Sequence, residues 1–232
     1  MLDQYERSIE EIREIERGQD GTVEIGTTGS ILRGGLSELL AGFAATHPKI
    51  TLRIHEQSPA AQITEVLSRR TDVSFNRSVP RDHELAYEYA WQEELVALLR
   101  TDHRFAERSE ISIDDLREDH HVVLRPDSSD FAAYVMSHII SAGFRPRISQ
   151  QVTDAQSIPS LVAAGFGVGI VPAGIAKLTS GPLVFLPIRP DPPISAVYIV
   201  YHHQDQAPSL QLFLSELRNK LGRGPDGMSH VS

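Results

Sequence analysis

The chain has 232 residues, of which 41% are hydrophobic and 23% charged. That composition allows one domain, or two small ones, to bury a core. The formal net charge at pH 7 is −9. Because binding to phosphates requires a basic surface, we expect this chain alone to be a poor nucleic-acid binder. The sequence contains no cysteine, which excludes disulfides, thiol nucleophiles and cysteine-based zinc sites.

The N-terminus is charged and lacks the continuous apolar stretch of a signal peptide. The longest apolar run elsewhere is too short to span a bilayer. These two features predict a soluble, cytoplasmic protein.

Residues 1–17 differ from the rest of the chain in their pattern. Apolar residues beginning with Leu2, Tyr5 and Ile9 follow spacings of three and four, and Gly18 ends the pattern. The apolar stripe is too narrow for a stable isolated helix of this length. The helix therefore packs either on its own domain or, as the end of a longer coiled-coil linker, on a partner helix.

Strands and helices alternate from residue 22 onward. The hydrophobic pattern predicts strands at 23–27, 50–55 and 72–76, with helices at 31–46 and 59–68 between them. Ser58 followed by Pro59 is typical of a helix start, with the serine as N-cap. Such a βαβαβ order implies a parallel sheet covered by helices.

The second half repeats this order less regularly. Two strands, 84–91 and 94–99, are predicted to meet at Gln92 and Glu93, and residues 111–116 to form a short capped helix. The remaining predicted strands are 122–124, 147–152, 168–171, 183–186 and 196–201, and the remaining helices are 129–142, 155–164 and 209–221. The tail is rich in Gly, Ser and Pro, which predicts disorder over 223–232.

No motif in the sequence indicates an enzyme. The glycines of residues 165–169 follow a predicted helix and open a strand, whereas a dinucleotide-binding motif follows a strand and opens a helix. The pairs at 120–121 and 202–203 are adjacent histidines, which point to opposite faces of a strand and do not chelate one metal easily. We therefore expect solvated surface histidines, no cofactor, no metal site and no enzymatic activity.

The turn at residues 27–30 is the more informative feature. It joins the carboxyl end of the first strand to the amino end of the first helix, where backbone N–H groups and the helix dipole favour an anion. The alternative is a helix cap that binds nothing. Ser58 would add a second hydroxyl, and Arg77, directly after the third strand, a positive charge.

Three segments at the start of the chain, 21–26, 47–52 and 72–75, together with 157–173, resemble the effector-binding domain of LysR-type transcriptional regulators. The resemblance covers about residues 21–221. It implies an α/β, two-lobed periplasmic-binding-protein-like fold, in which each lobe is a mostly parallel sheet covered by helices. The implied parts are the end of a linker helix (1–20), lobe I (21–93 and 197–222), lobe II (94–196) and the tail.

The resemblance also implies partners. The family carries a winged helix-turn-helix domain ahead of the linker helix, so that DNA would be contacted only through that part, which this chain lacks. A homodimer or homotetramer is implied, as is a small-molecule effector bound between the lobes. The chain looks most like regulators of aromatic-compound catabolism, which predicts an aromatic or unsaturated carboxylate as the effector.

The strand ends of lobe I and the resemblance to the family together predict the effector-binding residues. They are Thr28, Gly29, Ser30, Ser58, Pro59, Arg77, Ser128, Ser129, Phe131, Asp154 and Gln156. In lobe II the resemblance implies that Phe131 lies on a loop that faces the ligand and that Asp154 matches an acidic residue near the cleft. Two residues depart from the family pattern: Pro59 stands where a threonine is often found, and Asn76 replaces a small or apolar residue. A free-standing solute-binding protein of a transporter is the alternative function, and an enzyme on the same fold a third.

Overall fold

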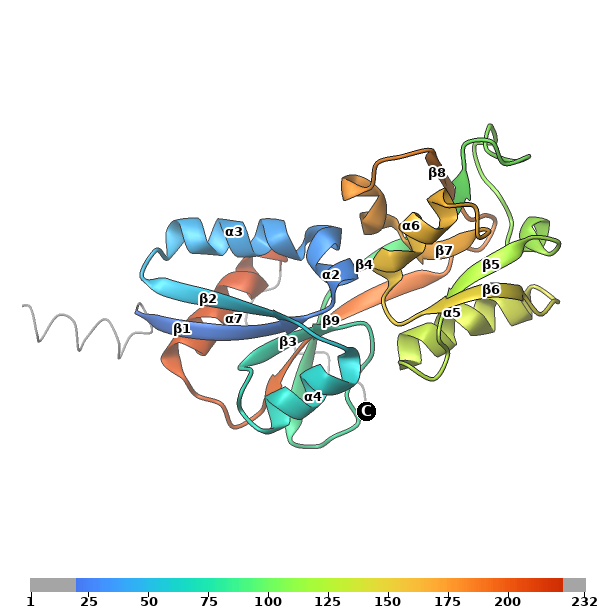
Figure 1. The fold of residues 1–232 in the computed structure, drawn as a ribbon. Coiled ribbons are helices and arrows are strands. Elements are labelled where there is room, and N and C mark those ends of the chain that lie inside the picture. The colour runs from blue at the N-terminus through green and yellow to red at the C-terminus, as the bar shows by residue number, and fades with distance from the viewer. Residues whose placement is uncertain (1–19, 223–232) are drawn as a thin grey trace, which may run out of the picture. The chain divides into compact units, whose positions relative to one another are not determined.

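The computed structural model describes residues 20–222 (Figure 1). The predicted helix at 1–17 and the predicted disordered tail at 223–232 lie outside the described residues. The chain divides into two compact units. Unit 1 comprises the described residues 20–27, 36–91 and 198–222, and unit 2 comprises 28–35 and 92–197.

The parallel strands of unit 1 form in the predicted order. β1 (Gly21–Thr27) pairs in parallel with β2 (Ile50–Glu56) on one edge and with β3 (Val73–Asn76) on the other. β9 (Ile194–His202) runs antiparallel to β3, through its residues 198–201. The strand order within unit 1 is therefore β2-β1-β3-β9, followed by the first half of β4 (Leu85–Arg100), whose residues 85–91 belong to this unit.

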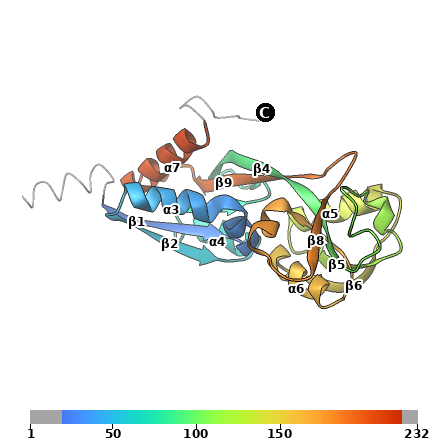
Figure 2. The same cartoon turned by 90° about the horizontal axis from the view of Figure 1, so that it is seen from above.

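Helices cover both faces of the unit 1 sheet. Across the sheet, the chain moves from β1 to β2 in one direction and from β2 to β3 in the other. Because both crossovers are right-handed, α3 (Ser37–Thr46) and α4 (Pro59–Leu67) lie on opposite faces of the sheet (Figure 1). α7 (Pro208–Lys220) lies beside α3 (Figure 2), where the rings of Phe43 and Phe213 meet edge to face with centroids 5.0 Å apart.

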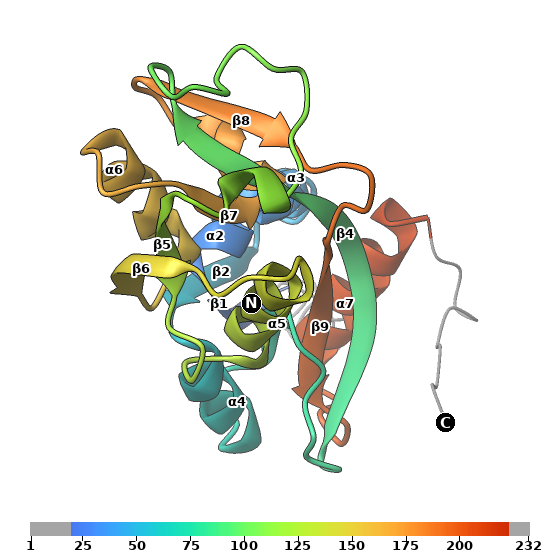
Figure 3. The ribbon, with the colours of Figure 1, turned by 90° about the vertical axis from the view of Figure 1, so that its right-hand side faces the viewer.

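Unit 2 contains a parallel pair and an antiparallel sheet. β5 (His120–Leu124) and β6 (Arg147–Val152) are parallel and joined through α5 (Asp130–Ser141). β4 (Leu85–Arg100) pairs antiparallel with β7 (Gly169–Pro172) and with β8 (Leu183–Pro187), which lies along it in Figure 3. The alternation of strands and helices did not predict these antiparallel pairings.

Short helical segments connect the strands of unit 2. They are η2 (Asp114–Leu116), η3 (Ala155–Ser157), α6 (Ile158–Ala163) and η4 (Ala173–Leu178). A continuous core of buried aliphatic side chains fills unit 2, including Leu95, Val122 and Ile158. Among the helices described in residues 20–222, none is long and apolar enough to cross a membrane.

Two predicted elements differ from the structure. The predicted helix 31–46 is broken into α2 (Gly29–Ile31), a π-helical turn η1 (Leu32–Leu36) and α3, because Gly35 has φ 135°. That conformation is open to glycine and interrupts a helix. The predicted strands 84–91 and 94–99 are one strand, β4, because Gln92 and Glu93 form no turn and continue the extended backbone.

The division into units also differs from the expected lobes. The units separate at 91/92 and 197/198, close to the expected 93/94 and 196/197, and residues 28–35 belong to unit 2 although we expected them in lobe I. The reason is local. After β1 the chain leaves the unit 1 sheet, and α2 packs on η3 and η4 of unit 2.

Candidate functional site

The turn after β1 forms a compact polar cluster in unit 2. Thr28 is the N-cap residue of α2, and its carbonyl oxygen accepts hydrogen bonds from the backbone N–H groups of Ile31 and Leu32 at 3.1 and 3.0 Å. The hydroxyl oxygens of Thr28 and Ser30 lie 3.2 Å apart. Ser30 is buried, with 4% of its surface exposed. The predicted hydroxyl is therefore at the helix start, and it is paired with its neighbour.

Asp154 and Gln156 complete this cluster, which we call the turn cluster (Thr28, Gly29, Ser30, Asp154 and Gln156). The backbone N–H of Gly29 donates to Asp154 Oδ2 at 3.3 Å, and the N–H of Gln156 donates to Asp154 Oδ1 at 3.0 Å. A Cβ on Gly29 would lie 2.1 Å from Gln156 Oε1. A side chain at position 29 would therefore displace the flexible end of the Gln156 side chain. The Asp154 carboxylate already accepts the hydrogen bond from the N–H of Gly29, which we expected to bind an anion.

The predicted residues around α5 make local contacts. Ser129 is the N-cap of α5 and accepts a hydrogen bond from the N–H of Ala132 at 3.1 Å. The hydroxyl of Ser128 donates to the carbonyl oxygen of Arg125 at 2.6 Å. Phe131 is 8% exposed and belongs to the core of unit 2. Ser129 thus caps the start of α5, Ser128 stabilises the turn before it, and the phenylalanine ring contributes to packing.

In unit 1, Ser58, Pro59 and Arg77 occupy the predicted strand ends and helix start. Ser58 Oγ accepts a hydrogen bond from the N–H of Ala61 at 3.3 Å, and Pro59 is the first residue of α4. Arg77 follows β3 directly. The predicted helix cap is therefore confirmed, while the role of these residues toward an effector stays a prediction.

Sequence reasoning missed two glutamines of unit 1, Gln57 and Gln62. Gln57 follows β2, and Gln62 lies in α4 with none of its surface exposed. The available signal was a polar residue on the side of an amphipathic helix that also carries Val66, which is buried as well. A buried amide is costly unless its polar atoms are paired, so such a residue indicates a structural or binding role.

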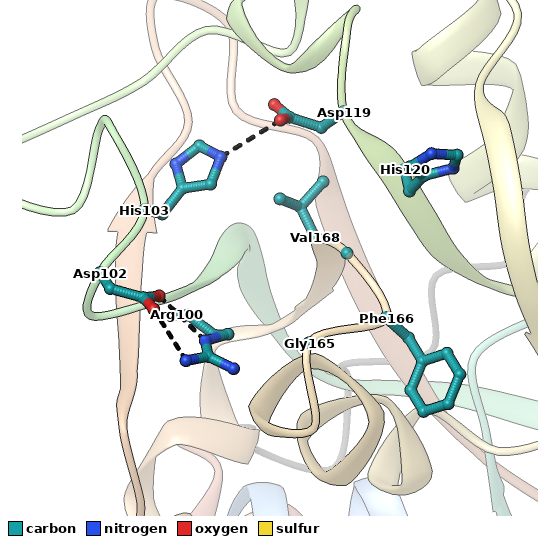
Figure 4. Close-up of a pocket in the computed structure, with 9 residues that line it drawn as sticks. Arg100, Asp102, His103, Asp119, His120, Gly165, Phe166 and Val168 are labelled. Atoms are coloured by element: carbon teal, nitrogen blue, oxygen red, sulfur yellow. Dashed lines mark hydrogen bonds and ion pairs between the residues drawn. The ribbon is translucent and has the colours of Figure 1, made fainter.

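A cavity of about 250 Å³ lies in unit 2, and none of the predicted effector residues lines it (Figure 4). An Arg100–Asp102 ion pair at 2.7 Å and a His103–Asp119 contact at 3.3 Å flank it. The hydrogen bond between Arg100 and Asp102 raises the pKa of Arg100 and lowers that of Asp102. The cations and carboxylates of this cavity thus largely pair with one another.

Two glycines beside the cavity have structural roles, as the sequence indicated. Gly165 follows α6 with φ 87°, and Gly167 precedes β7 with φ 134°. A Cβ on Gly167 would lie 2.1 Å from the carbonyl oxygen of His120. The glycines therefore end a helix and allow a close backbone approach.

The prediction of surface histidines is wrong for His121 and His202, which are 1% and 4% exposed. His121 lies on the inner face of β5 with Nε2 3.0 Å from the carbonyl oxygen of Leu116, and burial lowers its pKa. His202 Nε2 lies 3.2 Å from Glu84 Oε2. Each imidazole has a polar partner, which makes burial tolerable. Within residues 20–222, no group of three His, Asp or Glu side chains could hold a metal ion.

The sequence matches the family model of the LysR substrate binding domain over residues 16–222. The HTH-type transcriptional regulator TtuA of Agrobacterium vitis is 33% identical over 195 residues, which cover 81% of this chain and 62% of TtuA. The HTH-type transcriptional regulator BenM of Acinetobacter baylyi is 25% identical, over 89% of this chain and 67% of BenM. The chain thus spans less than two thirds of the length of TtuA.

Solved structures show the same fold. CbnR, a LysR family transcriptional regulator, matches with a TM-score of 0.85 and 25% identity over 94% of this chain and 75% of CbnR. The BenM effector binding domain with its effector benzoate matches with a TM-score of 0.78 and 23% identity, over 90% of this chain and 98% of that domain. The effector binding domain of QuiR in complex with shikimate matches with a TM-score of 0.78, 17% identity and coverages of 88% and 98%. The fold is therefore the predicted α/β, two-lobed periplasmic-binding-protein-like fold.

Proposed function

Because the chain belongs to the LysR substrate-binding domain family, we propose that it is the ligand-sensing domain of a bacterial LysR-type transcriptional regulator. It binds a small effector, an aromatic or unsaturated carboxylate, and thereby controls DNA binding by the full-length protein. Binding shifts the population of domain conformations, because an effector stabilises the conformation for which it has the higher affinity. The chain itself has no catalytic role in this proposal.

The full-length regulator acts as a homodimer or homotetramer in this proposal. It contacts DNA through a winged helix-turn-helix domain outside this chain. The net charge of −9 makes the chain itself a poor binder of DNA. A regulator of transcription in a bacterium works in the cytoplasm.

The turn cluster is the observation that carries the proposal. It gathers residues far apart in sequence, and Gly29 and Asp154 are joined although 125 positions separate them. Backbone N–H groups and the Ser30 hydroxyl are donors suited to a carboxylate. An effector carboxylate binds here in competition with Asp154 for the N–H of Gly29, while Ser58 and Arg77 of unit 1 are the further proposed ligands.

Titration calorimetry against a panel of carboxylates tests this assignment. Loss of a hydrogen bond to a charged group costs about 1.5–3 kcal/mol, so Ser30→Ala should weaken binding of the tightest carboxylate by about tenfold or more. Ser68→Ala is the matched control, because the Ser68 hydroxyl is exposed and bonds only within its own helix turn, to the carbonyl oxygen of Glu65. A neutral molecule as the tightest ligand, or unchanged affinity in Ser30→Ala, would show that the assignment is wrong.

A further inference from the structure

Buried amide side chains gather at the carboxyl end of the parallel strands of unit 1. Gln57 follows β2, Gln62 lies in α4, and Asn76 is the last residue of β3. Gln62 is 0% exposed and Asn76 2%. Gln57 is half-buried and its neighbour Ser58 is exposed, so the group reaches from the interior toward the surface. We call Gln57, Gln62 and Asn76 the amide cluster.

Specific contacts hold the amide cluster in place. Gln62 Nε2 donates to the carbonyl oxygen of Gln57 at 3.0 Å, and Asn76 Nδ2 donates to Ser74 Oγ at 2.8 Å. Gly26 lies between Gln62 and Ser74. A Cβ there would be 3.2 Å from Ser74 Cβ and 3.4 Å from Gln62 Cγ. The orientation of Gln62 is fixed because the Gln57 carbonyl requires a donor.

The amide oxygens of the cluster lack partners. Gln57 Oε1, Gln62 Oε1 and Asn76 Oδ1 are buried and accept no hydrogen bond from any residue in the range 20–222. An unsatisfied buried acceptor destabilises a protein, and most buried polar side-chain atoms are paired. Leucine or methionine would fill similar volume without that cost. The cluster therefore has acceptor oxygens that a donor from outside the protein chain would satisfy.

Resting on the proposed function, we propose that the amide cluster is a specificity element that selects effectors carrying hydroxyl or amino groups beside their carboxylate. Ligands of open α/β sheets bind at the carboxyl ends of the strands, where the cluster lies. It adjoins the proposed ligands Ser58 and Arg77 in the sequence. An amide oxygen only accepts hydrogen bonds, and an ionised carboxylate offers no donor, so neither group satisfies the other.

The test uses matched ligand pairs and calorimetry on the whole chain. The pairs are benzoate with 3,4-dihydroxybenzoate, and 1-cyclohexenecarboxylate with shikimate, so that each pair differs in hydroxyl groups alone. The hydroxylated member of at least one pair should bind about tenfold tighter or more, the effect of one or two satisfied acceptors.

Variants of Asn76 assign the preference to the cluster. Asn76→Leu should reduce the affinity ratio within a pair to about one. The affinity of the unhydroxylated acid should stay nearly unchanged, because the amide nitrogen that is also lost bonds within the protein, to Ser74. Asn76→Asp keeps acceptor oxygens and should keep the preference. Asn219→Leu is the matched control, since Asn219 is exposed on α7 of the same unit.

The outcomes separate this inference from the proposed function. If members of each pair bind equally, or if Asn76→Leu changes the unfolding midpoint but not the affinity ratio, the oxygens serve internal water and the specificity role is overturned. If neither these acids nor any other carboxylate binds, the proposed function itself fails. Should Asn76→Leu not fold, Gln62→Met provides the same comparison.

Discussion

The two units differ in how the polar groups at their strand ends are hydrogen-bonded. In unit 2, the turn cluster is satisfied internally, because the Asp154 carboxylate accepts from the N–H groups of both Gly29 and Gln156. In unit 1, the amide cluster uses its N–H groups within the protein and leaves its oxygens without donors. The first arrangement is preorganised without a ligand, whereas the second keeps acceptor oxygens for the proposed effector. The proposed recognition of hydroxyl or amino groups therefore belongs to unit 1.

The largest expected effect on stability comes from Asp154→Ala in unit 2. The substitution removes the N-cap of η3 and leaves the N–H of Gly29 without its acceptor. Loss of a cap and an orphaned donor together cost about 1–3 kcal/mol. Urea unfolding of the variant measures this loss in the free energy of unfolding. Asp154→Asn keeps one acceptor oxygen, so its free energy of unfolding should fall clearly less. Equal losses in the two variants would mean that the carboxylate geometry contributes little.

A smaller effect is expected from Asn76→Leu in unit 1. The variant loses the hydrogen bond to Ser74 but also removes the unpaired Asn76 Oδ1. The buried Ser74 hydroxyl loses its partner, which destabilises the variant, while removal of the unpaired amide oxygen offsets that loss, so the net change should stay within about 1 kcal/mol. Unfolding without added ligand is the measurement. A loss as large as that of Asp154→Ala would remove the contrast between the units.

The smallest effects are those of pH, and their signs differ between the units. Burial lowers the pKa of His121 in unit 2 below 6.5. As the pH falls through 6.5, the unfolded chain therefore binds a proton that the folded protein does not, and stability decreases. His121→Gln should flatten this part of the stability profile, while His83→Gln should not, because the side chain of His83 is 95% exposed. An unchanged profile in His121→Gln would exclude the histidine as its source.

Asp72 in unit 1 gives the stability of the protein a pH dependence of the opposite sign. Burial raises its pKa above 3.8, although the N–H of Glu24 donates to its carboxylate at 2.8 Å. The folded protein therefore holds this proton to a higher pH than the unfolded chain, and the resulting stabilisation is lost as the pH rises through the raised pKa. Asp72→Asn should remove this dependence in unfolding experiments between pH 3 and 7. A steeper dependence in the variant would contradict the assignment.

Much of the fold could be predicted because its signals are local. The N-cap Ser58 lies where the sequence places it, and Gly165 follows the end of a helix. The helix predicted from Ser129 begins one residue later, with Ser129 as its N-cap. A serine that accepts from an N–H three residues ahead, or a glycine with positive φ, depends on neighbouring residues alone. The break at Gly35 was missed because a glycine inside a helical pattern is tolerated at some cost, so its presence alone does not predict an interruption.

The sequence by itself therefore determined most of the elements and the Ser58 cap, because periodicity and capping act over a few residues, and its resemblance to known segments indicated the family of this protein. Only the tertiary structure decided that residues 28–35 belong to unit 2, that Asp154 covers the N–H of Gly29, and that Gln62 and Asn76 are buried with unpaired oxygens. These features arise from contacts between distant segments. Whether a polar group is satisfied depends on which atoms from elsewhere in the chain surround it, and that information lies in the packing.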